Sequence, residues 1–415
     1  MPRPDTRVRI AFDLAAGGVG DFFTLDDPTK GELDGTTFKL AGDILEDVTD
    51  DVKEVTVRRG RSRELERYQA GAATVDLDNS GRKYDPAAGT AITPYGASMR
   101  PRKQITVTSE GFPVFSGVVE DWDLEYKLNG GHISSVKSTD GFVFLANELI
   151  DPHTTTSQLS GERIAAILDR SEIDWPAGRR NIDDGVVTLQ ADAVGGTADP
   201  KPVNALKYLQ RVDEAEQGAL FIAGDGRLTF RSRSNLQILS STVFADDGSG
   251  IPFSNIEAAY GSEELRNRIT VSRLNGGTVT SSGTASIAEY GAIDYELSDV
   301  LLNTDAEAQA LADLIRNRYE EPILRIDALE VNTLGLTATQ VEEVLALELG
   351  ELVEVKYTPS GIGDQIDQFV RIDSIEHQIT PDQHRIKFDF SRAEAVALVL
   401  DDEDFGILDE NTLGY

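Results

Sequence analysis

The sequence predicts a mainly β fold in which a small α+β region is inserted between two strand-rich regions. Short β-branched segments separated by turn residues fill the start of the chain, a helical period replaces them in the middle, and strands then return. The last residues are rich in carboxylates and are predicted to form an extended arm. The predicted boundaries are 1–145, 146–235, 236–390 and 391–415.

The first region is predicted to consist of short antiparallel strands. The predicted strands are Val55–Val57, Ala73–Leu77, Gln104–Val107 and Val114–Val119. Turn residues such as Asp78-Asn79-Ser80-Gly81 separate them. Strands at this spacing are typical of a sandwich or a barrel.

The middle region changes to a helical period and forms the α+β insertion. A first helix is predicted with Ser160 as its N-cap, and a second over Val203–Val212. Ala219–Ala223 and Arg227–Phe230 then flank Gly224-Asp225-Gly226, which predicts a hairpin.

The third region is predicted to be a second strand-rich unit interrupted by one helix. Thr304 and Glu307 have the spacing of a capping box, and the helix is expected to run to Tyr319 and to stop at Glu321-Pro322. The predicted strands are Arg268–Ser272, Leu324–Val331, Leu349–Tyr357, Phe369–Ile375 and Arg385–Phe390.

Composition excludes several classes of function. The 415 residues include no cysteine, which removes disulfides, thiol nucleophiles and thiolate zinc sites. Seventy-two acidic against 39 basic residues give a net charge of −33, which repels nucleic-acid phosphates. No stretch approaches the roughly 18 apolar residues of a membrane helix, and the N-terminus lacks the apolar core of a signal peptide. Synthesis in a cytoplasm is therefore expected.

Motifs for catalysis or metal binding are also missing from the sequence. The four histidines have no metal-ligand spacing. His377 and His384 lie on either side of a predicted turn at Thr380–Asp382, which leaves open that they face each other across a hairpin, but we expect them to be exposed strand residues. Asp76–Gly81 starts like a calcium loop, but Ala87 occupies the position of the required glutamate. We therefore predict no catalytic residue, metal or cofactor. A glycosidase needs only two carboxylates, so its chemistry stays open.

One basic segment stands out in this acidic chain. Its arginines are Arg58, Arg59, Arg61, Arg63 and Arg67. We expect this segment to dock onto an acidic surface of a neighbouring subunit, in preference to being a solvated turn. The acidic arm offers a complementary partner through Asp401, Asp402, Glu403 and Asp404.

Several motifs resemble the minor tail protein family of siphophages that infect actinobacteria. The residues that carry the resemblance are Asp50–Leu65, Ala70–Asn79, Tyr84–Pro86, Arg100–Arg102 and Phe115–Trp122. Segments of the second half also resemble the family: Arg266–Val271, the Asn303–Tyr319 helix and Phe405–Asp409.

The resemblance implies a subunit of the baseplate hub type, with two β-barrel-like domains plus smaller insertions. Three copies would then form an adaptor ring that joins the tail tube to the tip and lines the DNA channel. The implied partners are other copies of the chain, a distal tail or tube ring, the tape measure, and tip or fibre proteins. The implied location is the tail tip of a virion, and enzymatic activity is not expected.

Three alternatives remain open at this point. A distal tail protein would form a hexameric ring, with one tube-like barrel domain in each subunit. A tail-associated cell-wall hydrolase or a receptor-binding protein would also fit a tail location. Two barrel-like regions in one subunit favour the hub.

Overall fold

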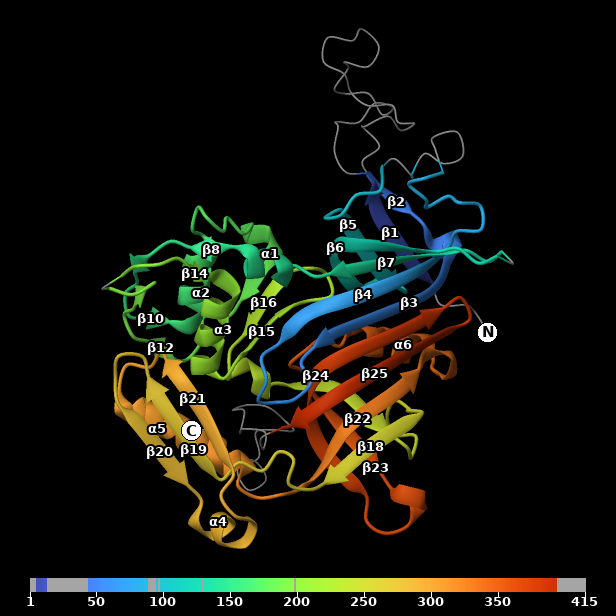
Figure 1. Ribbon diagram of the computed structural model, residues 1–415. Helices are drawn as coiled ribbons and strands as arrows, with labels where there is room; N and C mark the ends of the chain where they lie inside the picture. The colour runs from blue at the N-terminus through green and yellow to red at the C-terminus, as the bar shows by residue number, and fades with distance from the viewer. Residues whose placement is uncertain are drawn as a thin grey trace.

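The computed structural model describes residues 5–12, 44–88, 95, 98–128, 130–197 and 199–393. Strands dominate these residues and form large antiparallel sheets, so the predicted mainly β class is confirmed. Figure 1 shows the first strand-rich region, the inserted module and the second strand-rich region as distinct parts of the molecule. The predicted arm residues Asp401, Asp402, Glu403 and Asp404 lie outside the described residues.

Within the described residues, thirteen strands form one sheet. The first strand-rich region contributes β1 (Thr6–Phe12), β2 (Ile44–Asp47), β3 (Val52–Gly60), β4 (Gln69–Asp78), β5 (Gln104–Ser109), β6 (Phe112–Glu125) and β7 (Ile133–Thr139). The second contributes β17 (Leu239–Ala245), β18 (Asn255–Tyr260), β22 (Leu324–Asn332), β23 (Leu352–Tyr357), β24 (Ile366–Thr380) and β25 (Gln383–Arg392). The path runs β18-β22-β25-β24-β3-β4-β7-β6-β5-β1-β2, with β23 and then β17 attached to β24.

The long strand β24 connects the two strand-rich regions. Its first part, Ile366–Arg371, pairs with β23, and its second part, Ser374–Ile379, pairs with β3. The change of partner occurs beside a β-bulge between Ile372 and Ser374 in the ladder with β25. The two regions therefore share one sheet, and the described residues form no closed barrel. A strand pattern predicts that a segment is extended, but it does not identify the partners of a strand.

The inserted module packs three helices against short strands. The helices are α1 (Phe142–Asn147), α2 (Ser160–Leu168) and α3 (Ala205–Glu216). The strands are β8 (Leu149–Ile150), β9 (His153–Thr154), β10 (Gln158–Leu159), β11 (Arg180–Ile182), β12 (Thr188–Leu189), β13 (Ala193–Val194), β14 (Val203–Asn204), β15 (Ala219–Ile222) and β16 (Leu228–Arg231). The predicted hairpin is present as β15 and β16.

The predicted N-cap of α2 is wrong. Leu159 holds the cap position, and the hydroxyl of Ser160 instead donates to the buried Glu216 at the end of α3. Asn204 caps α3, because its side chain accepts from the amide of Lys207. A buried acceptor in the neighbouring helix thus recruits the serine that local sequence assigns to capping.

The second strand-rich region contains a smaller sheet and more helices than predicted. Its remaining elements are β19 (Arg268–Arg273), β20 (Thr278–Ser282), α4 (Thr284–Tyr290), β21 (Asp294–Val300), α5 (Asp305–Tyr319) and α6 (Ala338–Ala346). The capping box of α5 is confirmed: the Glu307 amide donates to Thr304, and the Thr304 amide donates to Glu307. The prediction of one helix in 236–390 is wrong, because that range holds three. A second capping box, Thr337 with Gln340, begins α6.

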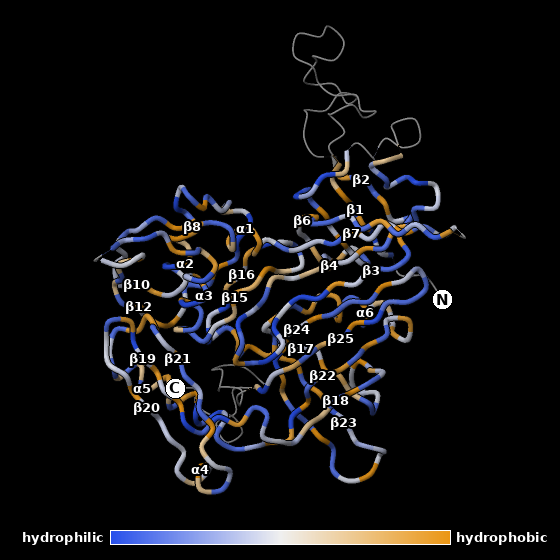
Figure 2. The backbone as a smooth tube through the Cα atoms, viewed as in Figure 1, coloured by the Kyte–Doolittle hydropathy of each residue, from blue (hydrophilic) through white to orange (hydrophobic). Residues whose placement is uncertain are grey.

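Buried side chains form two cores. The first lies inside the first strand-rich region and includes Phe12, Tyr84 and Val136. The second runs continuously through the module and the second region, with Phe142 and Phe388 among its members, and it also includes Tyr68 of the first region. Figure 2 shows hydrophobic residues alternating with hydrophilic ones along the strands, the pattern expected when one strand face is buried.

Candidate functional site

The basic segment predicted to form an interface begins with Arg58 and Arg59 in the last residues of β3 and continues beyond the point where this strand separates from β24. Gly60 ends β3 with a φ of +119°, and a Cβ there would lie 2.1 Å from the carbonyl oxygen of Asp373. Only glycine fits both the backbone conformation and the close approach. The next amide, of Arg61, donates to that same carbonyl at 2.9 Å. The segment is therefore anchored at the point where β24 changes partner.

Arg61 forms a buried ion pair across this junction. Its Nη2 lies 2.9 Å from Oδ1 of Asp373, and its guanidinium lies over the ring of Tyr68. Burial raises the pKa of the Asp373 carboxyl, although Arg61 beside it acts in the opposite direction. Burial likewise opposes the charge of Arg61, but Asp373 and the other anionic groups together hold the pKa of Arg61 above its ordinary value.

Arg59 connects three parts of the chain. Its side chain is 4% exposed, and its Nη1 lies 2.6 Å from Oε1 of Glu348, in the loop between α6 and β23. The second oxygen of Glu348 accepts from the amide of Gly224 at 2.9 Å, in the hairpin of the module. Arg59 and Glu348 thus join the first region, the module and the second region through charge-assisted hydrogen bonds.

The other arginines of the segment are more exposed. Arg63 lies 3.0 Å from Glu263, with more than half of each side chain exposed. Arg67 lies 2.7 Å from Glu214 of α3, and Arg58 lies 3.9 Å from Asp389 of β25. The structure therefore places all five arginines beside carboxylates of their own chain. A role in subunit contacts stays a prediction, and only Arg58, Arg63 and Arg67 keep the surface exposure that it needs.

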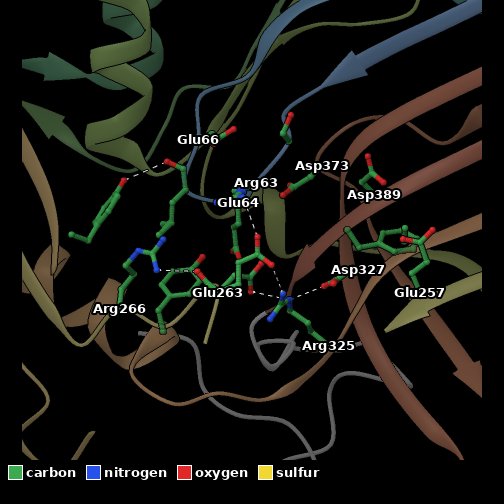
Figure 3. A pocket seen from close by; sticks show the side chains of 17 residues that line it. Arg63, Glu64, Glu66, Glu257, Glu263, Arg266, Arg325, Asp327, Asp373 and Asp389 are labelled. Atoms are coloured by element: carbon green, nitrogen blue, oxygen red, sulfur yellow. Dashed lines mark hydrogen bonds and ion pairs between the residues drawn. The ribbon is translucent and has the colours of Figure 1, made fainter. Parts of the chain in front are cut away.

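A cavity of about 370 Å³ opens beside this segment, between the two strand-rich regions (Figure 3). Eight carboxylates and three arginines line it. Arg325 lies near three of the carboxylates, at 3.5 Å from Glu263, 3.6 Å from Glu264 and 2.6 Å from Asp327. Glu64 is almost fully buried, and lies 3.3 Å from Arg318 and 3.9 Å from Arg371. Sequence analysis missed these partners, because they lie about 200 to 310 residues beyond the basic segment.

The cavity is an ion-pair network that holds the two regions together. Burial raises the pKa of Glu264 and holds the pKa of Tyr319 well above its ordinary value, so this side of the cavity is desolvated, whereas Arg63 and Glu263 are more than half exposed. Glu64, Glu263, Asp327 and Asp373 each lie within ion-pair distance of an arginine. Among the described residues, no group of three or more His, Asp or Glu side chains has an arrangement that could hold a metal ion.

The two strand histidines face each other and are buried, so the prediction that they are exposed is wrong. His377 Nδ1 lies 3.0 Å from His384 Nε2, and the hydroxyl of Ser109 lies 3.2 Å from His384 Nδ1. Burial lowers the pKa of His377 well below its ordinary value and that of His384 to about 4. The turn predicted between them is present, but the face on which they lie depends on the contact of β25 with β5.

Asp78, in the segment that resembles a calcium loop, forms a simple turn. Its carboxylate accepts from both the amide and the hydroxyl of Ser80. This is an Asx turn at the end of β4, which matches the prediction made from the missing glutamate.

None of the described helices is long and apolar enough to span a membrane.

Comparisons of the sequence with protein families and with curated proteins found no match. Comparison of the structure with solved structures found similar proteins. The chain resembles the 43 kDa tail protein of prophage MuSo2 from Shewanella oneidensis with a TM-score of 0.54 and 15% identity, over 85% of this chain and 96% of that one. It resembles the tail protein from Neisseria meningitidis MC58 with a TM-score of 0.54 and 12% identity, over 85% and 94%. This chain has the fold of phage tail proteins.

The likeness extends over nearly the whole length of both tail proteins, so the similarity in fold is not confined to a single sheet. At 15% and 12% identity it concerns the fold alone and does not transfer individual residues. A relation to siphophages of actinobacteria, suggested by the sequence motifs, is not tested by these two structures, which come from other bacteria.

Proposed function

We propose that this chain is a structural subunit of a phage tail tip, and that it forms a threefold hub or adaptor ring between the tail tube and the tip. The observation that carries the proposal is the fold likeness to two tail proteins over more than nine-tenths of their length. The buried ion pairs that join the two strand-rich regions also support it, because a ring subunit under load needs regions that move as one body.

In this proposal each subunit contributes its two strand-rich regions to the ring, so that three subunits contribute six strand-rich regions. Six similar surfaces would match a sixfold tube above, while the trimer matches a threefold tip below. The net charge of −33 per chain would give the passage an acidic wall along which DNA moves by like-charge repulsion.

The rotational symmetry of the protein in an intact virion tests this function. We expect threefold density at the junction of tube and tip in cryo-electron microscopy. Sixfold density would indicate a distal tail ring instead of a hub. Absence of the protein from the tail would reject both assignments. Acidic side chains on the outer surface instead of the lumen would reject the acidic passage alone.

A wall hydrolase is the enzymatic alternative, and a zymogram on peptidoglycan tests it. The proposal predicts no lytic band from the purified chain. A clear band would overturn the structural assignment and would direct attention to carboxylate pairs outside the ion-pair network.

A further inference from the structure

A groove of about 440 Å³ lies between the first strand-rich region and the module. Phe144 and Leu145 of α1, Val118 of β6 and Trp175 after α2 give it an apolar lining. Phe144 is 42% exposed and lies in this groove beside the other apolar side chains, where together they form an exposed apolar surface. The apolar lining and its exposure indicate a surface that another chain covers.

The backbone around the groove holds its shape. Trp175 packs onto Gly141, where a Cβ would lie 2.9 Å from the indole ring. The indole N–H of Trp175 donates to the carbonyl of Arg179 at 2.9 Å. Gly117 on the opposite wall approaches the carbonyl of Thr139 so closely that a Cβ would lie 2.2 Å from it. These contacts fix Trp175 on one wall of the groove and the strand at Gly117 on the other.

Arg102 and Arg179 add two exposed positive charges to this lining. The Arg102 guanidinium lies over the Phe144 ring, 5.8 Å from its centroid. Neither arginine forms an ion pair within the described part of the chain, in contrast to the five arginines of the basic segment. Glu148 and Asp174 also reach the groove, so an occupant with carboxylates must place them toward the two arginines.

We propose that this groove binds the C-terminal arm, residues 394–415, of a second copy of the chain. Twenty-two residues follow Ala393, with seven carboxylate side chains and no lysine or arginine. Leu398-Val399-Leu400 directly precedes Asp401–Asp404, and Phe405 follows, so apolar and acidic groups alternate in blocks. The apolar blocks fit the lining around Phe144 and Trp175, and the acidic block complements Arg102 and Arg179. Fully extended, residues 394–415 would span at most roughly 75 Å.

The inference rests on the proposed ring, because a closed ring needs one patch that binds a different patch on the next subunit. It also changes the partner expected for the arm. Arg59 and Arg61 are occupied inside the chain, and the cavity beside Arg63 is lined mainly by charged side chains, which fit Leu398-Val399-Leu400 less well than the groove does.

Charge reversal of the full-length chain tests the proposal. We expect Arg102→Glu with Arg179→Glu to weaken self-association at least tenfold in analytical ultracentrifugation at physiological salt. The matched control is Arg58→Glu with Arg63→Glu, which changes the net charge equally and should weaken self-association no more than threefold. A larger loss in the control pair than in the groove pair would overturn the groove and favour the basic segment.

A charge swap separates lost binding from lost folding. Asp401→Arg with Asp402→Arg should also weaken association, and combining it with the two groove reversals in one chain should restore at least half of the lost affinity. A synthetic peptide of residues 394–415, added in excess to the wild-type chain, should dissociate the oligomer and change the fluorescence of Trp175. Absence of rescue together with absence of peptide binding would overturn the proposal. Unchanged self-association in the groove variant would also overturn it, because the arm would then dock within its own chain.

The proposed ring and the proposed use of the groove can be rejected independently of each other. Threefold density in the virion with association unaffected by the groove variant would reject the groove and leave the proposed function intact. Absence of the chain from the tail would reject the proposed function, whatever the peptide does.

Discussion

The two strand-rich regions share one sheet but bury their cores differently. Among the described residues, the first closes its core with its own side chains, and Ile379 of β24 is the one buried side chain that the second region adds to it. The second shares a continuous core with the module, in which α2 and α3 pack together with residues as distant as Phe388. This packing predicts two cooperative units within one continuous sheet, and it predicts that the module unfolds together with the second region, although the module follows the first region in sequence.

Removing Phe388 from the shared core should have the largest effect. Phe388 is fully buried and lies against Phe244 and Phe390. Phe388→Ala should lower the free energy of unfolding by about 4 kcal/mol, because the cavity cannot refill. Amide hydrogen exchange should accelerate in α2 and α3 together with β22 and β25, and β1 and β5 should keep their protection.

Phe115→Ala provides the matched change in the first core, since Phe115 is buried to the same degree. Its exchange should accelerate in β1 and β5 and leave α2 and α3 protected. Equal acceleration in all elements for both variants would show that the two cores unfold as one.

The junction between the regions should be nearly as sensitive. Arg61→Met leaves Asp373 buried without its partner and should cost about 3 kcal/mol in urea denaturation. Adding Asp373→Leu should recover much of that loss, because the unpaired buried charge is then removed. The control Arg63→Met breaks an exposed pair and should cost no more than about 1 kcal/mol. Similar losses for Arg61→Met and Arg63→Met would contradict the importance of burial.

The buried histidines should make the junction of β24, β25 and β5 sensitive to acid. Their folded pKa values lie below the ordinary 6.5, that of His384 at about 4. Between the unfolded and folded pKa values the unfolded chain binds more protons, so stability falls as pH drops from 6.5, and the contribution of His384 levels off below about 4. Each histidine contributes up to about 1.4 kcal/mol per pH unit.

Buried carboxyls with raised pKa values, such as Asp213 and Asp373, have the opposite pH dependence. The measurement is therefore a difference: the free energy of unfolding of wild type against His377→Gln with His384→Gln, from pH 7 to 4. The variant should lose less stability over this range. Parallel curves would show that the histidines do not carry the effect.

The smallest expected effect concerns the cap of α5 in the second region. Thr304→Ala removes the acceptor of the Glu307 amide and should cost about 1 kcal/mol. Thr304→Ser keeps the hydroxyl and should be close to wild type. Because α5 contributes Leu311 and Ile315 to the shared core, the loss should appear in the same unfolding transition that Phe388→Ala shifts.

Local features of the fold were predictable, and non-local ones were not. The capping box at Thr304, the hairpin at Gly224–Gly226 and the turn at Asp78 each depend on a few neighbouring residues, and each is present. The number of helices in the second region, the cap of α2 and the burial of the histidines were predicted wrongly. The cap of α2 and the burial of the histidines depend on partners in other elements. The helix count also depends on capping signals that are present in the sequence but were not recognised, such as that of Thr337.

The same division holds for the candidate site. The basic segment was recognisable because arginines are rare in this acidic chain, and its carboxylate partners were expected from charge alone. Charge complementarity does not distinguish a partner in the same chain from one in a neighbour, and the structure supplies Glu348, Asp373 and Glu214 from within. The groove at Phe144 left no signal in the sequence, because its lining comes from segments that are apart in the chain.

The sequence by itself determined the mainly β class, the acidic charge, and some of the local turns and caps, such as the turn at Asp78 and the capping box at Thr304. These properties follow from residue periodicity and from contacts over a few residues. Only the tertiary structure decided that β24 joins two regions into one sheet, that Arg59 and Arg61 are buried in ion pairs, and that the module shares a core with the second region. Those outcomes depend on which surfaces meet, and periodicity carries no information about a partner hundreds of residues away.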